Sequence, residues 1–361
     1  MKIENGMITF EFLPHDKEHA DVFFKSYNFH SFDLVTTEPI KSLKPKNDRI
    51  CRYCTKKIPE VSFDNEAHLY PEFLGNKYSV SDFECDTCNK KFGKLEKQLS
   101  NFIGPFITLN GTKGKKKIPT TPSHDGKMLA SKGLLFDSKI IELGVTDNDP
   151  SHIHYNPDTN SFEILFTKQP YVPKDVYKAF LKIALGMLDE SEVSKFDAGF
   201  KMLNDKTFAK TIIGPIVSVN VYSVSVPYNY TGIVMFKKRN DIDIIPTYMM
   251  VLFYRQFMFQ FLLPFEDSFF LTMKKLTIAV PILPPILSTE KIEIFHCNKS
   301  YERLDSEISK SVVQTIVLQP DTKDVKQVGM DLETKEMVDG EFDLNKIVKF
   351  ILGYQSRVDN N

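Results

Sequence analysis

The sequence has few cysteines and no leader signal. Its 361 residues contain five cysteines, too few for the dense disulfide framework of small secreted proteins. The N-terminal residues have no basic segment that leads into an apolar run, which argues against a signal peptide. We therefore expect a cytoplasmic protein whose clustered cysteines bind metal rather than form disulfides.

Long hydrophobic runs are also scarce. The most apolar stretch, MMVLFYRQFMFQFLLPF at 249–265, is interrupted by Arg255, Gln256 and Gln260. It is also shorter than the ~20 residues that span a membrane. We predict buried strands there and no membrane partner. The sequence further lacks an internal repeat, a recognisable phosphate loop and a nucleophile motif.

The chain as a whole has almost no net charge, but one region of it is strongly basic. The formal net charge is −1, yet residues 41–117 carry +7 and the remainder carries −8. Such a basic island predicts a surface that faces phosphate. Within it, the run TKGKKK supplies candidate nucleic-acid contacts at Lys113, Lys115, Lys116 and Lys117. The alternative is that these lysines only solvate a loop.

Composition and periodicity divide the chain into four parts, and we expect an α+β protein. The predicted parts are a strand-rich extension at 1–45, a cysteine-containing domain at 46–110, a basic Gly/Pro-containing loop or linker at 111–127, and a larger mixed α+β domain at 128–361.

Two helices are predicted in the last part. The segment VPKDVYKAFLKIALGML, at 172–188, has one apolar stripe, and Pro173 suits a first helical turn. The segment DLNKIVKFIL, at 343–352, begins with Asp343 as a cap and also has apolar residues at helical spacing. Both helices should present an apolar face to the domain core.

Four of the five cysteines form two C-x-x-C pairs. The pairs are Cys51 with Cys54 and Cys85 with Cys88. This spacing lets both thiolates of each pair reach one tetrahedral Zn²⁺ ion, so two pairs make a closed structural site. A redox C-x-x-C motif would not need the second pair. We therefore predict a structural zinc ion bound by four cysteines.

The residues around the second pair predict a strand and a helix. FDNEAHLYPEFLG, at 63–75, is typical of a short strand carrying His68 and followed by a turn. NKKFGKLEKQLSNFIG, at 89–104, has an apolar stripe at helical spacing and ends in glycine. Asn89 then lies in the first turn of that helix, beside the zinc site.

The order C-x-x-C, A-H-L-Y-P-E-F-L-G and C-x-x-C-N-x-x-F-G resembles the HNH endonucleases, which have the ββα-metal nuclease fold. The resemblance is strongest to the subgroup with a zinc ribbon around the site, and it covers residues 48–105. It implies a small ββα-metal module with a Cys₄ zinc, followed here by the larger α+β domain.

The resemblance also implies residue roles. His68 matches the general base that activates water, and Asn89 matches the helix residue that binds a catalytic Mg²⁺ or Mn²⁺ ion. A histidine can accept a proton near neutral pH, and Mg²⁺ prefers oxygen ligands. The substrate implied is nucleic acid, and we expect DNA.

One position departs from the family pattern. Many members have an acidic residue or a histidine directly before the base, and here Ala67 stands there. Glu66 is an alternative metal ligand, because residues two apart share a strand face. Glu96 is another, since it lies seven residues after Asn89 and so on the same helix face.

We therefore hypothesise a metal-dependent HNH endonuclease whose C-terminal domain binds a regulatory ligand or a protein partner. The layout is similar to that of bacterial antiphage effectors, which join an N-terminal HNH nuclease to a C-terminal sensor. The alternative is a non-catalytic zinc-ribbon module that binds nucleic acid or protein and in which His68 is structural.

Overall fold

The computed structural model places the chain in two compact units. Unit 1 comprises Met1–Leu99 and Val172–Ser309, and unit 2 comprises Ser100–Tyr171 and Lys310–Asn361. The chain contains both helices and antiparallel sheets, with nine consecutive described strands after the last described helix, which confirms the predicted α+β class. The structure describes residues 2–4, 7–35, 43–114, 117–133, 140–147, 149–204, 218–240, 245–263, 280–288, 291–292, 296–318, 328–330, 337–339 and 349–353.

The predicted domain boundaries near residues 45, 110 and 127 stay a prediction. The compact units report which segments cluster in space, and this does not show which segments fold independently. The boundary between the units falls inside one helix, α2 (Asp86–Ile103).

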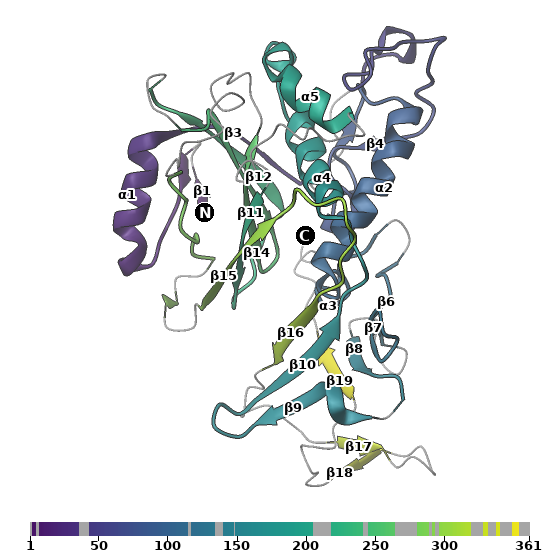
Figure 1. Cartoon of the computed structure of the whole chain (residues 1–361), viewed down its shortest axis with the longest axis vertical. Coiled ribbons are helices and arrows are strands. Elements are labelled where there is room, and N and C mark those ends of the chain that lie inside the picture. The colour runs from purple at the N-terminus through teal and green to yellow at the C-terminus, as the bar shows by residue number, and fades with distance from the viewer. Residues whose placement is uncertain are drawn as a thin grey trace. The chain divides into compact units, whose positions relative to one another are not determined.

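Unit 1 is built on a six-stranded antiparallel sheet (Figure 1). The strand order is β15-β11-β14-β13-β12-β3. The strands are β3 (Tyr27–Leu34), β11 (Ser218–Val224), β12 (Gly232–Lys238), β13 (Tyr248–Tyr254), β14 (Phe257–Leu263) and β15 (Cys297–Arg303).

The apolar run at 249–265 contributes the central hairpin of this sheet. Strands β13 and β14 are buried along their whole length, which confirms the prediction of buried strands. Arg255, at the turn between them, has a φ of 51°. The described residues contain no helix that is both long and apolar enough to cross a membrane.

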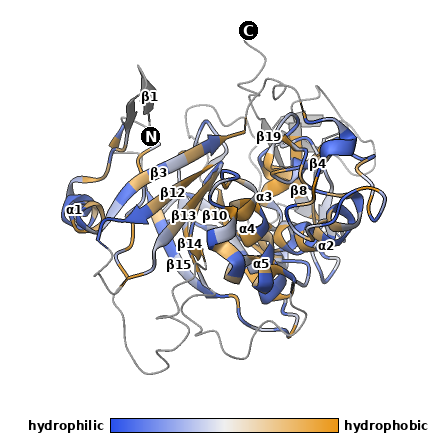
Figure 2. Ribbon diagram, turned by 90° about the horizontal axis from the view of Figure 1, so that it is seen from above, coloured by the Kyte–Doolittle hydropathy of each residue, from blue (hydrophilic) through white to orange (hydrophobic). Residues whose placement is uncertain are grey.

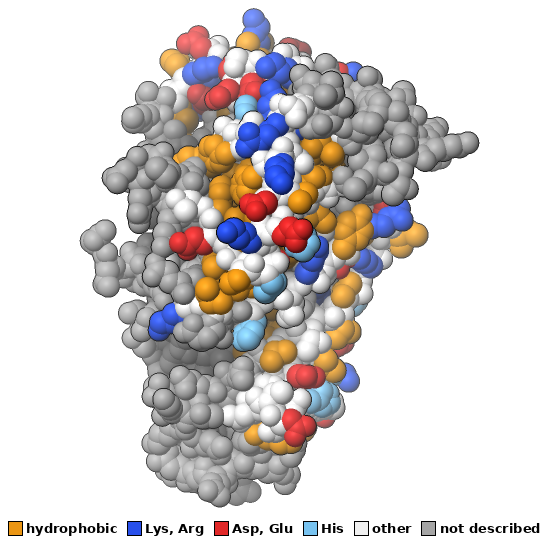
Figure 3. Space-filling model, turned by 90° about the vertical axis from the view of Figure 1, so that its left-hand side faces the viewer, with side chains coloured by type: hydrophobic (Ala, Val, Ile, Leu, Met, Phe, Trp, Pro, Cys, Tyr) orange, Lys and Arg blue, Asp and Glu red, His pale blue; other side chains and the backbone are white. Residues whose placement is uncertain are grey.

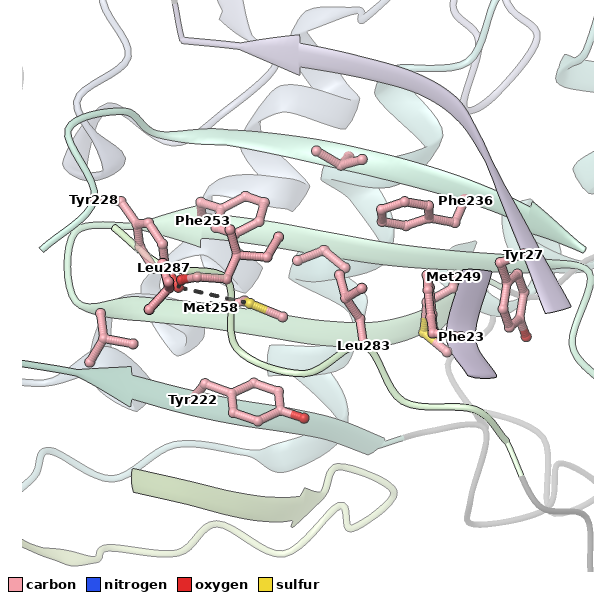
Figure 4. Close-up of a cluster of buried hydrophobic side chains, with 14 of the residues drawn as sticks. Phe23, Tyr27, Tyr222, Tyr228, Phe236, Met249, Phe253, Met258, Leu283 and Leu287 are labelled. Carbon is pink, nitrogen blue, oxygen red and sulfur yellow. Dashed lines mark hydrogen bonds between the residues drawn. The ribbon is translucent and has the colours of Figure 1, made fainter. Parts of the chain in front are cut away.

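Both faces of the sheet are covered. Side chains that alternate along β13 and β14 point to opposite faces. One face packs against α1 (Lys17–Ser26) and the segment 280–287, with Phe23, Leu283 and Met258 in one buried cluster (Figure 4). The Tyr228 hydroxyl, also in this cluster, donates a hydrogen bond to the Ile286 carbonyl (3.0 Å).

Helix α4 (Pro173–Gly186) covers the other face. Its Phe180 ring lies 5.3 Å from the ring of Phe259, and the Tyr177 hydroxyl donates to the Leu262 carbonyl. The helix and Pro173 in its first turn were both predicted from the sequence. Figure 2 shows the hydrophobic residues that α4 carries. Because α4 lies between the sheet and the cysteine region, it is buried on nearly every side.

The outer face of α1 is polar. Its exposed side chains alternate in sign, as with Lys17, Glu18, Asp21 and Lys25, and Figure 3 shows this mixture from the α1 side. On this helix the described residues therefore lack the excess of positive charge that attracts a phosphate backbone.

Shorter elements complete unit 1. They are β1 (Lys2–Glu4), β2 (Met7–Thr9), β4 (Ala67–His68), β5 (Val80–Ser81), α5 (Asp197–Asn204) and the 3₁₀ turns Pro14–Asp16, Lys46–Asp48, Glu72–Leu74 and Val193–Phe196.

Unit 2 contains two larger antiparallel sheets, ordered β16-β10-β9 and β19-β8-β7-β6, and the pair β17-β18. Buried side chains from both larger sheets, including Leu143 and Ile164, form its core. Its elements are α3 (Phe106–Leu109), β6 (Thr121–Pro122), β7 (Met128–Lys132), β8 (Ile140–Val145), a 3₁₀ turn (Pro150–His152), β9 (Ile153–Asn156), β10 (Ser161–Thr167), β16 (Val313–Leu318), β17 (Val328–Met330), β18 (Met337–Asp339) and β19 (Lys349–Gly353).

The prediction of a C-terminal helix at 343–352 was wrong for the residues of this segment that the structure describes. Residues 349–353 form strand β19, which pairs with β8 from Lys349 opposite Gly144 to Gly353 opposite Ile140. Residues 343–348 lie outside the described residues. The free backbone edge of β8 offers hydrogen bonds that an apolar stripe in the sequence does not reveal.

We predict that Gly232→Ala destabilises unit 1. A Cβ at this position would lie 2.7 Å from the Asp33 carbonyl oxygen and 2.5 Å from Leu34 Cδ2, so β3 would have to shift. The expected loss is about 1–3 kcal/mol of unfolding free energy, measured by urea denaturation.

The matched control is Gly93→Ala, in the middle of α2. No atom lies within 4 Å of a Cβ built there, so this change should stabilise the helix by about 0.5–1 kcal/mol. Equal effects of the two substitutions would contradict the packing assigned to Gly232.

Candidate functional site

The four clustered cysteines meet at one point. Cys51 and Cys54 lie in a tight turn in which the Thr55 amide donates to the Cys51 carbonyl, and Cys85 and Cys88 lie at the start of α2. Their four sulfur atoms all lie within 4.8 Å of one another. Within the described residues, this is the only such group of three or more His, Cys, Asp or Glu side chains.

The cluster has the dimensions of a tetrahedral metal site. The sulfur atoms of Cys54 and Cys85 lie 3.8 Å apart, which is close to the ~3.8 Å edge of a tetrahedron with metal–sulfur bonds of ~2.3 Å. Cys51, Cys85 and Cys88 are also at most 5% exposed. The four cysteines could therefore bind a metal such as zinc.

The pKa values of the thiols indicate why the cluster needs a cation. The hydrogen bond with Cys88 lowers the pKa of Cys51 to about 5, and the same bond, together with burial, raises the pKa of Cys88. Burial raises the pKa of Cys85 to about 11. The protein alone therefore does not favour four thiolates, whereas a bound cation would.

Asp86, in the first turn of α2, holds the loop that leads to His68. Its carboxylate accepts hydrogen bonds from the amides of Asp64 and Asn65, both 2.9 Å, and from the Ser62 hydroxyl. Burial raises the pKa of Asp86, but these hydrogen bonds outweigh it and lower the pKa to about 2. The loop is thereby fixed to the helix that carries Asn89.

His68 lies on a short strand, β4, as the sequence predicted. This strand pairs with β5. Its Nε2 lies 3.2 Å from Oε1 of Glu72, in the turn that follows Pro71. This contact has the distance of an ion pair but not the alignment of a hydrogen bond. Nδ1 is buried and has no hydrogen-bond partner within the described part of the chain.

Asn89 lies next to the strand that carries His68. Its side-chain nitrogen is 3.5 Å from the carbonyl oxygen of Glu66, two residues before His68. The structure therefore brings the two predicted catalytic residues onto adjoining elements. The Glu66 side chain is exposed, whereas Ala67 is 1% exposed and belongs to the core. An acid at position 67 would need a partner inside the protein.

Glu96 is already engaged. Its Oε1 lies 3.5 Å from Nζ of Lys182, which comes from α4. Lys182 also donates a 2.5 Å hydrogen bond to the His68 carbonyl. A carboxylate that neutralises an ammonium group is less free to bind a metal ion, so Glu96 fits that role less well than Asn89.

Glu84 is the second acidic partner of Lys182. The two charged groups are 3.3 Å apart, close enough for attraction but without the alignment of a hydrogen bond. Both side chains are at most 2% exposed. Burial raises the pKa of Glu84 to about 7, against the opposing effect of Lys182.

The structure describes two of the four lysines that are candidate nucleic-acid contacts. Lys113 and Lys117 are exposed in unit 2, and Lys115 and Lys116 lie outside the described residues. In unit 1, α2 exposes four further lysines, Lys90, Lys91, Lys94 and Lys97.

Sequence reasoning missed Glu72, Glu84 and Lys182. A signal existed for two of them. Glu72 follows His68 by four residues across a proline turn, and Lys182 interrupts the otherwise apolar sequence AFLKIALG. Glu84 directly precedes Cys85, but nothing in the sequence indicates that its carboxylate is buried.

Comparison with protein families identifies one segment. Residues 51–102 match the model of an HNH endonuclease family. The match spans both cysteine pairs, β4, β5 and most of α2, and it confirms the predicted resemblance for this short part of the chain. Searches of curated proteins and of solved structures found no match.

We predict that the purified protein contains about one zinc ion per chain and that Cys88→Ser lowers both the metal content and the thermal stability. The closed four-sulfur site binds zinc tightly, and loss of one ligand opens it. Elemental analysis and thermal melting measure the two effects.

Cys297→Ser is the matched control for this prediction, since Cys297 lies on β15 outside the cluster. It should retain both zinc and stability. Undenatured protein without zinc, or equal losses in the two variants, would contradict the assignment.

Proposed function

We propose that the chain is a metal-dependent HNH endonuclease that hydrolyses phosphodiester bonds, with DNA as the expected substrate. The observation that carries this proposal is the state of His68. One imidazole nitrogen lies 3.2 Å from the Glu72 carboxylate, and the other is buried without a partner in the described part of the chain. This histidine also lies inside the segment that matches the HNH endonuclease family.

His68 is the general base in this mechanism. A buried acceptor without a protein partner is a place where a water molecule binds. Nδ1 takes a proton from that water as its oxygen attacks the phosphorus atom. The bond from phosphorus to the leaving sugar oxygen breaks, and that oxygen takes a proton from a solvent water molecule. Glu72, 3.2 Å from Nε2, stabilises the imidazolium ion that forms.

Asn89 is the proposed protein ligand of the catalytic divalent cation, Mg²⁺ or Mn²⁺. Its side-chain nitrogen faces the Glu66 carbonyl, and its Oδ1 makes no hydrogen bond within the described residues. Bound there, the cation would neutralise charge that develops on the phosphate oxygens. Glu66 is a second candidate ligand, since its side chain is exposed beside Asn89.

The zinc ion proposed for the Cys₄ cluster is structural. It would hold the turn at Cys51 and Cys54 against the start of α2, because all four of its coordination positions are filled by sulfur. We further propose, from the layout of the chain alone, that the remainder binds a regulatory ligand or protein, as in antiphage effectors, and that the enzyme acts in the cytoplasm.

We predict that His68→Ala abolishes cleavage of plasmid DNA while zinc content, melting temperature and DNA affinity stay near the wild-type values. The base contributes mainly to the transition state, so its removal lowers kcat by about 10²–10⁴-fold. RNA tested beside plasmid DNA identifies the preferred substrate.

Asn89→Ala is the comparison for this variant. It should also lose cleavage, but higher Mg²⁺ or added Mn²⁺ should restore part of the activity, because a weakened metal site can be refilled by mass action. Retained cleavage by highly purified His68→Ala protein would refute the proposal and favour a zinc-ribbon module that only binds.

We predict that replacing Lys113, Lys115, Lys116 and Lys117 with glutamine weakens DNA binding and its salt dependence. Each lost phosphate contact should reduce the slope of log K against log salt by up to about one unit. Lys25→Gln, on the mixed-charge surface of α1, is the control. A slope unchanged by the fourfold substitution would mean that the lysines only solvate a loop.

A further inference from the structure

A buried lysine from α4 contacts the backbone of the proposed general base. Lys182 lies 114 residues after His68 in the sequence, outside the segment that matches the HNH family. Its Nζ donates a 2.5 Å hydrogen bond to the carbonyl oxygen of His68 and lies 3.5 Å from that of Leu69. The side chain is 2% exposed.

Packing alone does not explain a lysine at this position. Removing an ammonium group from water is costly, and apolar residues of similar volume often replace a buried ion pair without loss of stability. Lys182 has two acidic partners, Glu84 and Glu96, that compensate its charge. An apolar side chain on α4 would need neither acid, so the retained charge indicates a role that requires a hydrogen-bond donor.

The ammonium group connects the elements that carry the proposed chemistry. His68 is on β4, Glu96 is on α2 seven residues after Asn89, and Glu84 directly precedes the second cysteine pair. Strands β4 and β5 contain only two residues each, which is too short to hold this strand pair in place by packing alone. A common donor therefore fixes the strand relative to the helix.

Hydrogen bonds attach helix α4 to the segment of the first cysteine pair, so the backbone that carries Lys182 is held in place. The Arg52 guanidinium donates to the carbonyls of Leu185, Gly186 and Leu188 at the end of α4, and its carbon lies 3.7 Å from the centre of the Phe83 ring. The proposed zinc site, α4 and the His68 carbonyl are thus linked through side chains within unit 1.

We propose that Lys182 is a positioning residue of the nuclease site, which holds the His68 backbone at the distance from α2 that catalysis requires. This role rests on the proposed function. Lys182 acts through the His68 carbonyl and does not touch the reacting atoms. Its loss should lower kcat and leave the affinity for DNA unchanged, because the imidazole stays present but is displaced from the water and the cation.

The test compares Lys182→Met with the double variant Lys182→Met/Glu84→Gln. The single variant removes Lys182, the ammonium partner of the buried Glu84 carboxylate. The melting temperature of this variant should therefore fall. The double variant removes both charges at similar volume and should recover the wild-type melting temperature and zinc content. Its kcat at saturating DNA and Mg²⁺ should still be about ten- to a hundred-fold below wild type.

Two further measurements separate positioning from a purely structural role. Hydrogen exchange of peptides that cover residues 67–81 should be faster in the double variant, while that of α2 should be unchanged. Lys174→Met is the matched control, because Lys174 lies on the same helix but pairs with Glu307, whose side chain is 59% exposed. It should keep the wild-type kcat, KM and exchange pattern.

The outcomes distinguish this role from the proposed function. If wild type cleaves, His68→Ala does not, and the double variant cleaves with wild-type kcat, then Lys182 has no positioning role and the nuclease assignment stands. A higher KM with unchanged kcat would also overturn the role, since it would place Lys182 in substrate binding. If wild type cleaves neither DNA nor RNA, both proposals fail.

Discussion

The segment that matches the HNH endonuclease family depends on the convergence of four sulfur atoms from two places in the chain. Thirty residues separate Cys54 from Cys85, and the strand pair between them is two residues long on each side, too short to be stable alone. The hydrogen bond between Cys51 and Cys88 favours one thiolate at the expense of the other, so a cation that binds all four sulfur atoms would stabilise the whole arrangement. The positions of His68 and Asn89 follow from it.

Hydrogen bonds and buried charges also hold the segment around His68, in addition to the cysteine cluster. Asp86 holds the loop before β4, Glu72 lies 3.2 Å from one imidazole nitrogen of His68, and Lys182 holds the backbone carbonyl of the same histidine. Each acts on a different atom of the segment around His68. A side chain is placed accurately when its rotamer and its backbone are both restrained, and these contacts act on both the imidazole and the backbone of His68.

How much could be predicted from the sequence differs between elements. Helices α2 and α4 were predictable, because apolar spacing reports directly which face of an element is buried. The buried strands β13 and β14 were predictable for another reason, because their apolar run is interrupted and too short to span a membrane. The C-terminal segment was not. Its spacing fits a helix, yet residues 349–353 pair with β8, and the partner strand lies more than 200 residues earlier. Local periodicity contains no information about such a distant edge.

The sequence by itself determined the cysteine spacing, the strand with His68 and the helix start with Asn89, because these depend on residues close together in the chain. Only the tertiary structure decided that Lys182 and Glu84 meet behind that histidine and that Glu96 is paired with an ammonium group. The physical reason is that a buried charge needs a partner in space. Which distant residue supplies that partner follows from how α4 packs between the sheet and the cysteine region.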